Sequence, residues 1–92
     1  MYLIGDIGNT ETKICLFSEK SKLLKKIRFS TSLLNNKKLN KKLKFLKNKK
    51  FKLINCVFCS VVPKTFLIIK KYIETNFKIK CKELKNLSLN SL

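Results

Sequence analysis

The first third of the chain shows a two-residue alternation of side chains, the period of β-strands. Residues 2–7 form a short apolar run. Residues 12–18 form a second run, in which Ile14 and Leu16 share one face while Cys15 and Phe17 share the other, so this strand should be central. Residues 23–30 carry more charge, which is typical of an edge strand. Short polar turns join the three runs, so the pattern predicts an antiparallel meander.

The hydrophobic period then changes to that of an α-helix. Leu39, Leu43 and Leu46 recur at intervals of four and three, and lysine and asparagine fill the other faces. This spacing predicts a helix over residues 34–49, with an N-terminus that the local asparagines leave imprecise. The lysines of this segment are interpreted as a solvated helix face, and the alternative is a basic surface for a membrane or RNA.

A nearly continuous apolar run at residues 53–59 predicts a fourth strand of a different kind. Such runs are typical of strands that are parallel to a neighbour, buried on both faces and covered by helices. Pro63 suits the first turn of a helix, because its missing N–H has no partner there in any case. We therefore expect a second helix over residues 64–75 and a fifth strand over residues 77–82.

The predicted order of elements is β-β-β-α-β-α-β, which is an α/β fold. At 92 residues the chain is long enough for one domain with a modest core. We assign residues 1–83 to that domain. Residues 84–92 show no clear period, and we expect them to be a truncated or disordered tail.

The polar stretch between the first two strands has the residue types of a phosphate site. Gly8 lacks a Cβ, so its backbone can adopt a positive φ and approach a ligand closely. The amides of Gly8, Asn9 and Thr10 can form an anion-binding nest, and Lys13 adds a positive charge. Asp6 would repel phosphate unless it holds a bridging Mg²⁺, directly or through water. The predicted site comprises Asp6, Ile7, Gly8, Asn9, Thr10, Glu11, Thr12 and Lys13.

The same stretch has a plainer interpretation as a β-hairpin with a Gly-Asn turn. It is neither a P-loop nor a dinucleotide-binding fingerprint. Asp6 and Lys13 together favour the phosphate site over the plain turn.

The composition is strongly basic, with 22 Lys and Arg residues, five acids, no His and a formal net charge of +17. Such a charge suggests a polyanion as partner. However, Lys, Asn, Ile, Leu and Phe dominate, which is the bias expected of AT-rich codons. Nucleic-acid binders usually use Arg for bidentate contacts, and Arg28 is the single Arg in this chain. We therefore attribute the charge to codon bias and do not expect a nucleic-acid partner.

The four cysteines are expected to be reduced thiols in a cytoplasmic protein. Cys56 and Cys59 form a CxxC pair, but residues three apart on a strand point to opposite faces, so we expect no shared metal ion. Because the first strand starts almost at Met1, we expect no signal peptide. No apolar run reaches the ~20 residues of a membrane helix, so we expect no membrane partner.

Three motifs, in order, resemble those of type III pantothenate kinases, which belong to the actin/hexokinase/Hsp70-like superfamily. Asp6-Ile7-Gly8-Asn9-Thr10 with Lys13 resembles the phosphate loop of that family. Arg28-Phe29-Ser30-Thr31 resembles its Arg-Ile-Ser-Thr stretch. Ser60-Val61-Val62-Pro63 resembles its Ser-Ser-Val-Val-Pro motif, with Cys59 in place of the first serine. Together the three motifs extend over most of the chain.

The resemblance implies a ribonuclease-H-like domain whose five-stranded mixed sheet has the order 3-2-1-4-5. Asp6 would then lie at the carboxyl end of a central strand, where α/β sheets tend to bind ligands. Members of the family are roughly two and a half times as long and place two such domains around a cleft. The chain is therefore expected to be the first, actin-like half.

The resemblance also implies a function, the transfer of the γ-phosphate of ATP to pantothenate in coenzyme A biosynthesis. Asp6 matches the Mg²⁺-linked acid of the family, and Gly8, Asn9, Thr10 and Lys13 match its phosphate loop. The family has a Gly-x-Asp-Arg motif that carries the substrate contacts and the catalytic base, and this motif is absent before Leu92. The pantothenate pocket and a monovalent-cation site come from the same missing half. Family members are homodimers, a state that this sequence leaves open.

Three functions therefore remain open from the sequence. The first is a type III pantothenate kinase present as its N-terminal half. The second is a non-catalytic phosphate- or nucleotide-binding domain, acting with a separate second half. The third is a small basic nucleic-acid-binding protein, which would show steeply salt-dependent affinity and would not require Asp6.

Overall fold

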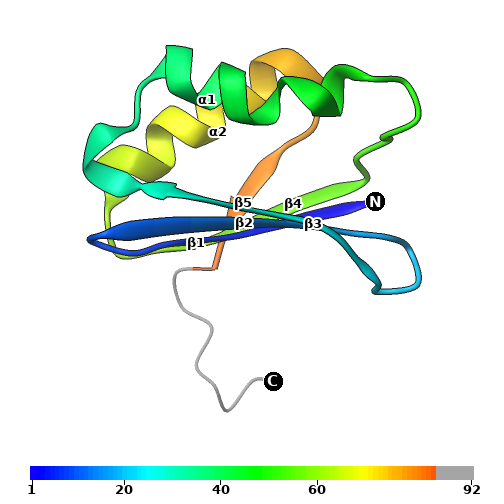
Figure 1. Ribbon diagram of the computed structural model, residues 1–92, viewed down its shortest axis with the longest axis horizontal. Coiled ribbons are helices and arrows are strands. Elements are labelled where there is room, and N and C mark those ends of the chain that lie inside the picture. Colours follow the sequence, from blue (N-terminus) through cyan, green and yellow to red (C-terminus); the bar gives the residue numbers. More distant parts are fainter. Residues whose placement is uncertain (85–92) are drawn as a thin grey trace.

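A computed structural model describes residues 1–84 of the chain (Figure 1). Its regular elements follow the predicted order of three strands, a helix, a strand, a helix and a final strand. The five strands form one mixed sheet in the order β3-β2-β1-β4-β5. The predicted α/β class and strand order are therefore confirmed, and the architecture is consistent with a ribonuclease-H-like domain.

The first three strands form the predicted antiparallel meander. They are β1 (Tyr2–Ile7), β2 (Glu11–Phe17) and β3 (Leu23–Ser30). β1 and β3 have the predicted limits, and β2 is displaced by one residue. β3 lies at the edge of the sheet and β2 lies between β3 and β1, as their side-chain patterns indicated. Ser21, in the turn from β2 to β3, has a positive φ of 64°.

The crossover from β3 to the next strand is less regular than predicted. It contains a 3₁₀ turn η1 (Thr31–Leu33), helix α1 (Asn36–Leu43) and a 3₁₀ turn η2 (Lys44–Lys47). The prediction of one helix over residues 34–49 was therefore too long. Lysines recur three and four residues apart in this segment without an acid between them, and such like-charge pairs weaken an α-helix. Asn35 caps α1, since its side chain accepts a hydrogen bond of 2.9 Å from the Lys38 amide.

The second half of the sheet also differs in its element limits. β4 (Asn55–Ser60) leads into α2 (Pro63–Phe77), which begins at the proline, and β5 (Cys81–Glu83) follows. The predicted fifth strand over residues 77–82 was wrong at its start, because Phe77 extends α2 and packs against Tyr72 with ring centroids 6.0 Å apart. Lys78 then ends the helix with a left-handed backbone, φ 56° and ψ 33°.

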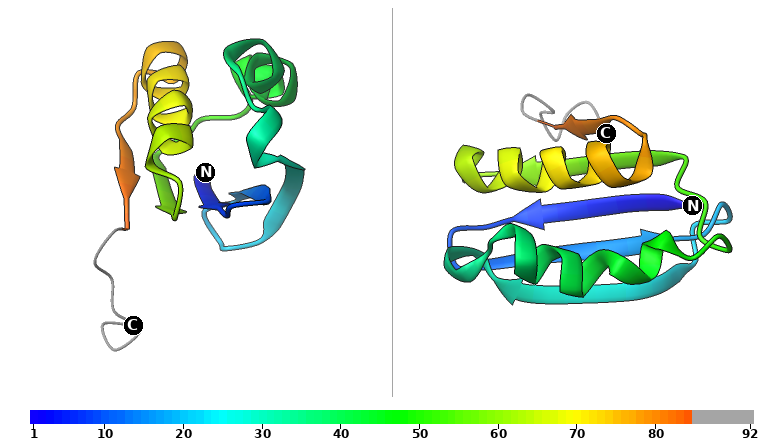
Figure 2. Two further views of the ribbon diagram at one scale, coloured as in Figure 1. Left: turned by 90° about the vertical axis from the view of Figure 1, so that its left-hand side faces the viewer. Right: turned by 90° about the horizontal axis from the view of Figure 1, so that it is seen from above.

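Both helices lie on the same face of the sheet, so the domain has two layers (Figures 1 and 2). The buried core fills the space between the helices and the sheet. Its residues are Leu3, Ile7, Ile14, Leu16, Ile27, Leu39, Leu43, Leu46, Leu53, Cys56, Phe58, Phe66, Ile69, Tyr72, Ile73 and Cys81.

The opposite face of the sheet, called here the open face, is not covered by a helix among the described residues. The prediction that the fourth strand is buried on both faces is therefore wrong. Cys56 and Phe58 are buried under the helices, whereas Val57 is half-buried and Cys59 is exposed. Ile4, beside Val57 in the sheet, is likewise 47% exposed on the open face.

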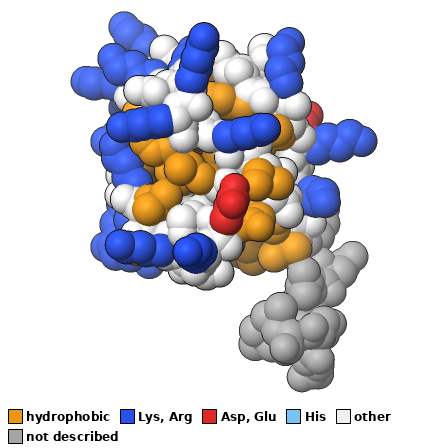
Figure 3. Space-filling view, turned by 90° about the vertical axis from the view of Figure 1, so that its right-hand side faces the viewer, with side chains coloured by type: hydrophobic (Ala, Val, Ile, Leu, Met, Phe, Trp, Pro, Cys, Tyr) orange, Lys and Arg blue, Asp and Glu red, His pale blue; other side chains and the backbone are white. Residues whose placement is uncertain are grey.

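Lysines lie next to apolar side chains at the end of the sheet that holds the β2–β3 turn. The Lys25 ammonium lies 4.0 Å from the centroid of the Phe45 ring, and that of Lys50 lies 5.1 Å from the centroid of Phe51. These are cation–π distances, and the lysine stems cover apolar surface. Figure 3 shows this side of the molecule, where lysines surround hydrophobic side chains.

The last described residue remains attached to the sheet. The Leu84 amide donates a hydrogen bond of 2.8 Å to the Phe58 carbonyl, next to β5. The rest of the predicted tail, residues 85–92, lies outside the described residues. Among residues 1–84, no helix has both the length and the apolar character needed to cross a bilayer.

Candidate phosphate-binding site

The three motifs found in the sequence meet at one end of the sheet. Gly8, Asn9 and Thr10 form the turn between β1 and β2, and they lie at the carboxyl end of β1. The end of β3 is beside this turn because Ser30 is in register with Glu11. The end of β4 is on its other side, because Ser60 is in register with Ile7. Segments that are far apart in the chain therefore surround one loop.

The loop turns tightly without the left-handed backbone conformation that glycine permits. Gly8 donates its amide to the Glu11 carbonyl at 3.0 Å, and its φ is not positive. Glycine is suited to this position for another reason. A Cβ on Gly8 would lie 3.1 Å from the Glu11 carbonyl oxygen, closer than most side chains approach a backbone atom. The small size of Gly8 therefore permits the turn to close.

Two buried threonines hold the loop to β3. Thr31 donates its hydroxyl to the Gly8 carbonyl at 2.8 Å and its amide to the Thr10 carbonyl at 3.0 Å. Its Oγ1 also lies 2.7 Å from Oγ1 of Thr12. Because the single Thr31 hydroxyl proton is directed to Gly8, Thr12 must be the donor in the second bond. The chain of bonds fixes the position of the loop relative to two strands.

Sequence reasoning noted Thr31 as part of a motif but assigned it no role. Thr31 is 5% exposed and Thr12 is fully buried, and both hydroxyls are satisfied by each other and by the loop. A threonine directly after a predicted edge strand is the available signal. That signal is weak, because the contact joins residues 23 positions apart in the chain.

The chemically active groups of the loop are accessible. Asp6, Asn9, Thr10 and Lys13 are exposed. Within residues 1–84, the amides of Asn9 and Thr10 have no hydrogen-bond acceptor. The carbonyls of Gly8 and Thr10 are engaged by Thr31, so the free donors of the turn are amides. Free backbone N–H groups in a tight turn are suited to bind an anion.

Asp6 and Lys13 are cross-strand neighbours on the open face. They occupy facing positions in the β1–β2 ladder, which places their Cβ atoms roughly 5 Å apart. In the described part of the chain they form no ion pair with each other. Both charges therefore remain available to an exogenous ligand. The carboxylate suits a cation and the ammonium suits a phosphate.

Three other residues of the predicted site, Ile7, Thr12 and Glu11, are either buried or paired with another side chain. The side chains of Ile7 and Thr12 are fully buried in the core, so neither side chain can contact a ligand. Glu11 is exposed and pairs with Arg28, with its Oε1 3.7 Å from Nε. This ion pair is solvated and is worth little in stability. It does direct the Glu11 charge away from the turn and toward β3.

A divalent ion would have to rely on Asp6 together with non-protein ligands. Among residues 1–84 no group of three or more Cys, Asp or Glu side chains is close enough to hold a metal ion. One carboxylate with waters and phosphate oxygens is the usual coordination of Mg²⁺ in phosphate-transfer sites, so the residues present fit that ion. Cys56 is buried and Cys59 is exposed, which confirms that these two thiols face opposite sides of β4.

The turn that follows β4 borders the site on the side opposite β3. The Ser60 hydroxyl accepts a hydrogen bond of 3.0 Å from the Val62 amide, which shapes the turn into α2. The Val61 amide donates to the Ile7 carbonyl at 3.0 Å and ties this turn to β1. Cys59 lies in register with Asp6, so its exposed thiol is adjacent to the carboxylate on the open face.

Comparison with known proteins agrees with this arrangement. A model of the type III pantothenate kinase family matches residues 2–91. The type III pantothenate kinase of Pelagibacter ubique (strain HTCC1062) is 48% identical over 92 residues, which is the whole of this chain and 37% of the length of that relative. This chain therefore spans less than half the length of the curated relative that it matches. With its three motifs assembled around one loop, the chain belongs to the type III pantothenate kinase family.

Proposed function

We propose that this chain forms the ATP-phosphate-binding half of a type III pantothenate kinase. The observation that supports the proposal most directly is the loop between β1 and β2. At the carboxyl end of the central strand it presents a carboxylate, an ammonium and two amides that have no acceptor among residues 1–84. Thr31 and Thr12 hold it in place from behind. The loop could therefore bind a phosphate without the entropy cost of ordering a flexible segment.

The proposed roles follow from the charge of each group. The Asn9 and Thr10 amides and the Lys13 ammonium bind phosphate oxygens, and Asp6 holds Mg²⁺ directly or through water. Phosphoryl transfer depends mainly on positioning and on neutralising the charge of the phosphates. Bound Mg²⁺ would supply that neutralisation. Asp6 lies beside Lys13, so the residue that would hold the metal and the residue that would bind phosphate are neighbours.

Further groups are required for the complete reaction. Transfer to the pantothenate hydroxyl needs a general base, and none of the predicted site residues is assigned that role. We propose that the base, the pantothenate pocket and the monovalent-cation site lie in the part of the family fold that has no counterpart among residues 1–92. A cytoplasmic location is part of the same proposal, since ATP and coenzyme A precursors are cytoplasmic metabolites. Homodimerisation is also part of it, because the resemblance to the family implies it.

The test is a calorimetric titration of the 92-residue chain with ATP, with and without Mg²⁺. It should be done at about 0.3 M salt, where exposed charges are well screened. We expect a dissociation constant in the millimolar range, about −4 kcal/mol, and only when Mg²⁺ is present. Replacing Asp6 by Asn should weaken binding about tenfold and remove the Mg²⁺ dependence, because the amide cannot hold the metal. Replacing Lys13 by Ala should also weaken binding.

Matched controls separate the loop from the general basic surface. Glu19→Gln makes the same change in charge as Asp6→Asn, but in the turn at the other end of the sheet. Lys26→Ala does the same for Lys13→Ala on β3. Both controls should bind Mg-ATP like the unaltered chain. Unchanged Mg-ATP binding by Asp6→Asn would remove the physical basis of the proposal.

A non-catalytic nucleotide-binding role is a second candidate. It is favoured because the hydrogen bonds that join the loop to Thr31 and Thr12 lie within residues 8–31. The two candidates differ in phosphate transfer, which is measured by ADP release from Mg-ATP with pantothenate present. We expect background rates from this chain alone, since a general base is worth roughly 10²–10⁴-fold. Rates well above background would instead show that residues 1–92 hold a complete catalytic site.

A further inference from the structure

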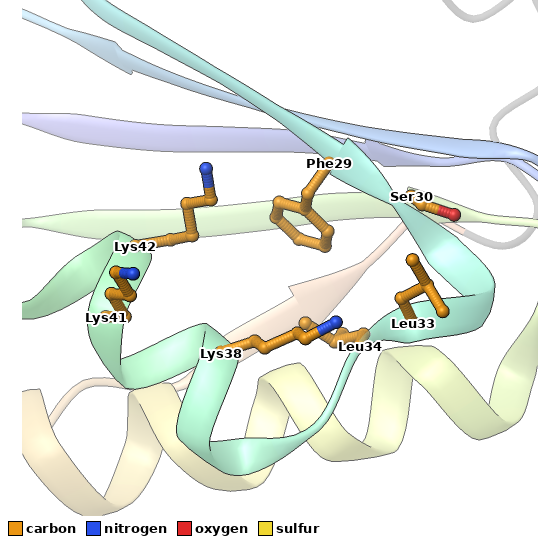
Figure 4. A pocket seen from close by; sticks show the side chains of 7 residues that line it. All are labelled: Phe29, Ser30, Leu33, Leu34, Lys38, Lys41 and Lys42. Atoms are coloured by element: carbon orange, nitrogen blue, oxygen red, sulfur yellow. The ribbon is translucent and has the colours of Figure 1, made fainter.

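A hollow lies beside the end of β3, and none of residues 6–13 lines it. It is a hollow of about 300 Å³ between the end of β3, the η1 turn and the outer side of α1 (Figure 4). Its volume is at the lower limit of known small-molecule sites, so it suits a compact ligand. Its walls are Phe29, Ser30, Leu33, Leu34, Lys38, Lys41 and Lys42.

One wall of the hollow carries only positive charge. Lys41 and Lys42 lie three and four residues after Lys38 on α1, so both are neighbours of Lys38 on the helix surface. Among the described residues, no acid lines the hollow. Within residues 1–84, none of these three ammonium groups forms an ion pair. Like charges at this spacing repel one another, and a bound anion would relieve that repulsion.

The opposite wall is apolar and partly open to solvent. The Phe29 ring projects from β3 into the hollow, and Leu33 and Leu34 close its other end (Figure 4). Phe29 and Leu34 are half-buried, whereas Leu33 is 60% exposed. Covering exposed apolar surface with a ligand removes it from water, which favours binding. The hollow therefore offers an apolar surface and a cationic surface to the same ligand.

We propose that this hollow binds a small organic phosphate or carboxylate with an apolar body. The acidic group would lie between Lys38, Lys41 and Lys42, and the apolar body would contact Phe29 and Leu33. The charge complementarity selects an anion, and the apolar wall selects an organic anion over inorganic phosphate. The site shares no lining residue with the loop of residues 6–13 and does not depend on the function proposed for that loop.

The test uses hexyl phosphate as probe, with inorganic phosphate and hexan-1-ol as partial probes. Binding is followed in the full 92-residue chain by amide chemical shifts at about 0.15 M salt. We expect hexyl phosphate to shift the amides of residues 29–42 saturably. It should bind about tenfold more tightly than inorganic phosphate, because a few methylenes leave water. Hexan-1-ol should bind more weakly than hexyl phosphate, because it lacks the charge.

Variants identify the walls that bind the probe. The double change Lys38→Gln with Lys42→Gln should weaken binding of hexyl phosphate about tenfold. The matched change Lys20→Gln with Lys22→Gln, in the β2–β3 turn, should leave it unchanged. Leu33→Ser should reduce the preference for hexyl phosphate over inorganic phosphate. Because Leu33 is exposed, this variant should remain folded.

Three results would overturn the proposal. One is equal affinity for hexyl phosphate and inorganic phosphate. Another is equal weakening by the two pairs of lysine substitutions, which would indicate general attraction by the basic surface. The third is a set of shifts confined to residues 6–13, which would place the probe in the phosphate loop.

Discussion

Replacing Thr31 by Val tests whether the buried threonine pair holds the phosphate loop. Valine has nearly the same shape and keeps one methyl group, but it lacks the hydroxyl. The change removes the 2.8 Å bond to the Gly8 carbonyl and the 2.7 Å bond with Thr12. The Thr31 amide still donates to the Thr10 carbonyl, so one connection to the loop remains.

The magnitude follows from which groups lose their partners. Thr12 is fully buried, so its hydroxyl would be left without a partner and without water, at a cost of about 1–3 kcal/mol. Gly8 is half-buried and its carbonyl can be hydrated, so its lost bond costs about 1 kcal/mol or less. We expect the free energy of unfolding to fall by about 2–3 kcal/mol. In a domain of this size that lowers Tm by roughly 10 °C or more.

Urea denaturation measures the loss of stability, and hydrogen exchange measures its location. We expect amide exchange to become faster in residues 8–12, because the loop opens more often without its buried anchor. Mg-ATP affinity should fall with it, since a mobile loop must be ordered on binding. Thr65→Val is the control. It is the same change at another buried threonine, in α2, and should leave Mg-ATP affinity unchanged.

The double variant Thr12→Val with Thr31→Val provides the sharper test. Replacing both partners leaves no buried hydroxyl unpaired, so the double variant should be less destabilised than the sum of the two single variants. Simple additivity of the two effects would refute the reasoning. A loss below about 0.5 kcal/mol in Thr31→Val alone would refute it as well.

Two further predictions concern the central strands. Gly5→Ala should unfold the domain or cost several kcal/mol, as measured by urea denaturation, because a Cβ at Gly5 would overlap the Phe58 ring, which packs over β1 in the core. A thiol reagent should modify Cys59 first, because it is exposed, and Cys56 only on unfolding. A 3.5 Å hydrogen bond to Cys81 and burial both raise the pKa of the Cys56 thiol, which further limits its reactive thiolate. Mass spectrometry of partly labelled protein gives the order, and early modification of Cys56 would contradict it.

Local patterns in the sequence determined the elements and the candidate loop. Alternation over a few residues placed β1 and β3 within their observed limits, because burial of one strand face imposes a period of two. Pro63 marked the start of α2, because proline is tolerated in the first helical turn. The candidate phosphate loop could be identified for the same reason, since its polar groups and the glycine that permits its turn are adjacent in the chain.

Only the tertiary structure decided which faces are covered and which distant residues meet. An apolar β4 predicted burial on both faces, but both helices pack on one side and leave Cys59 exposed. The end of α2 depended on a contact of Phe77 with the core, which no local period reveals. The contacts of Thr31 with Gly8 and Thr12 arise because the end of β3 lies beside the β1–β2 turn. Such contacts depend on strand order and register, and these are set by the packing of the whole sheet, so short windows of sequence do not contain them.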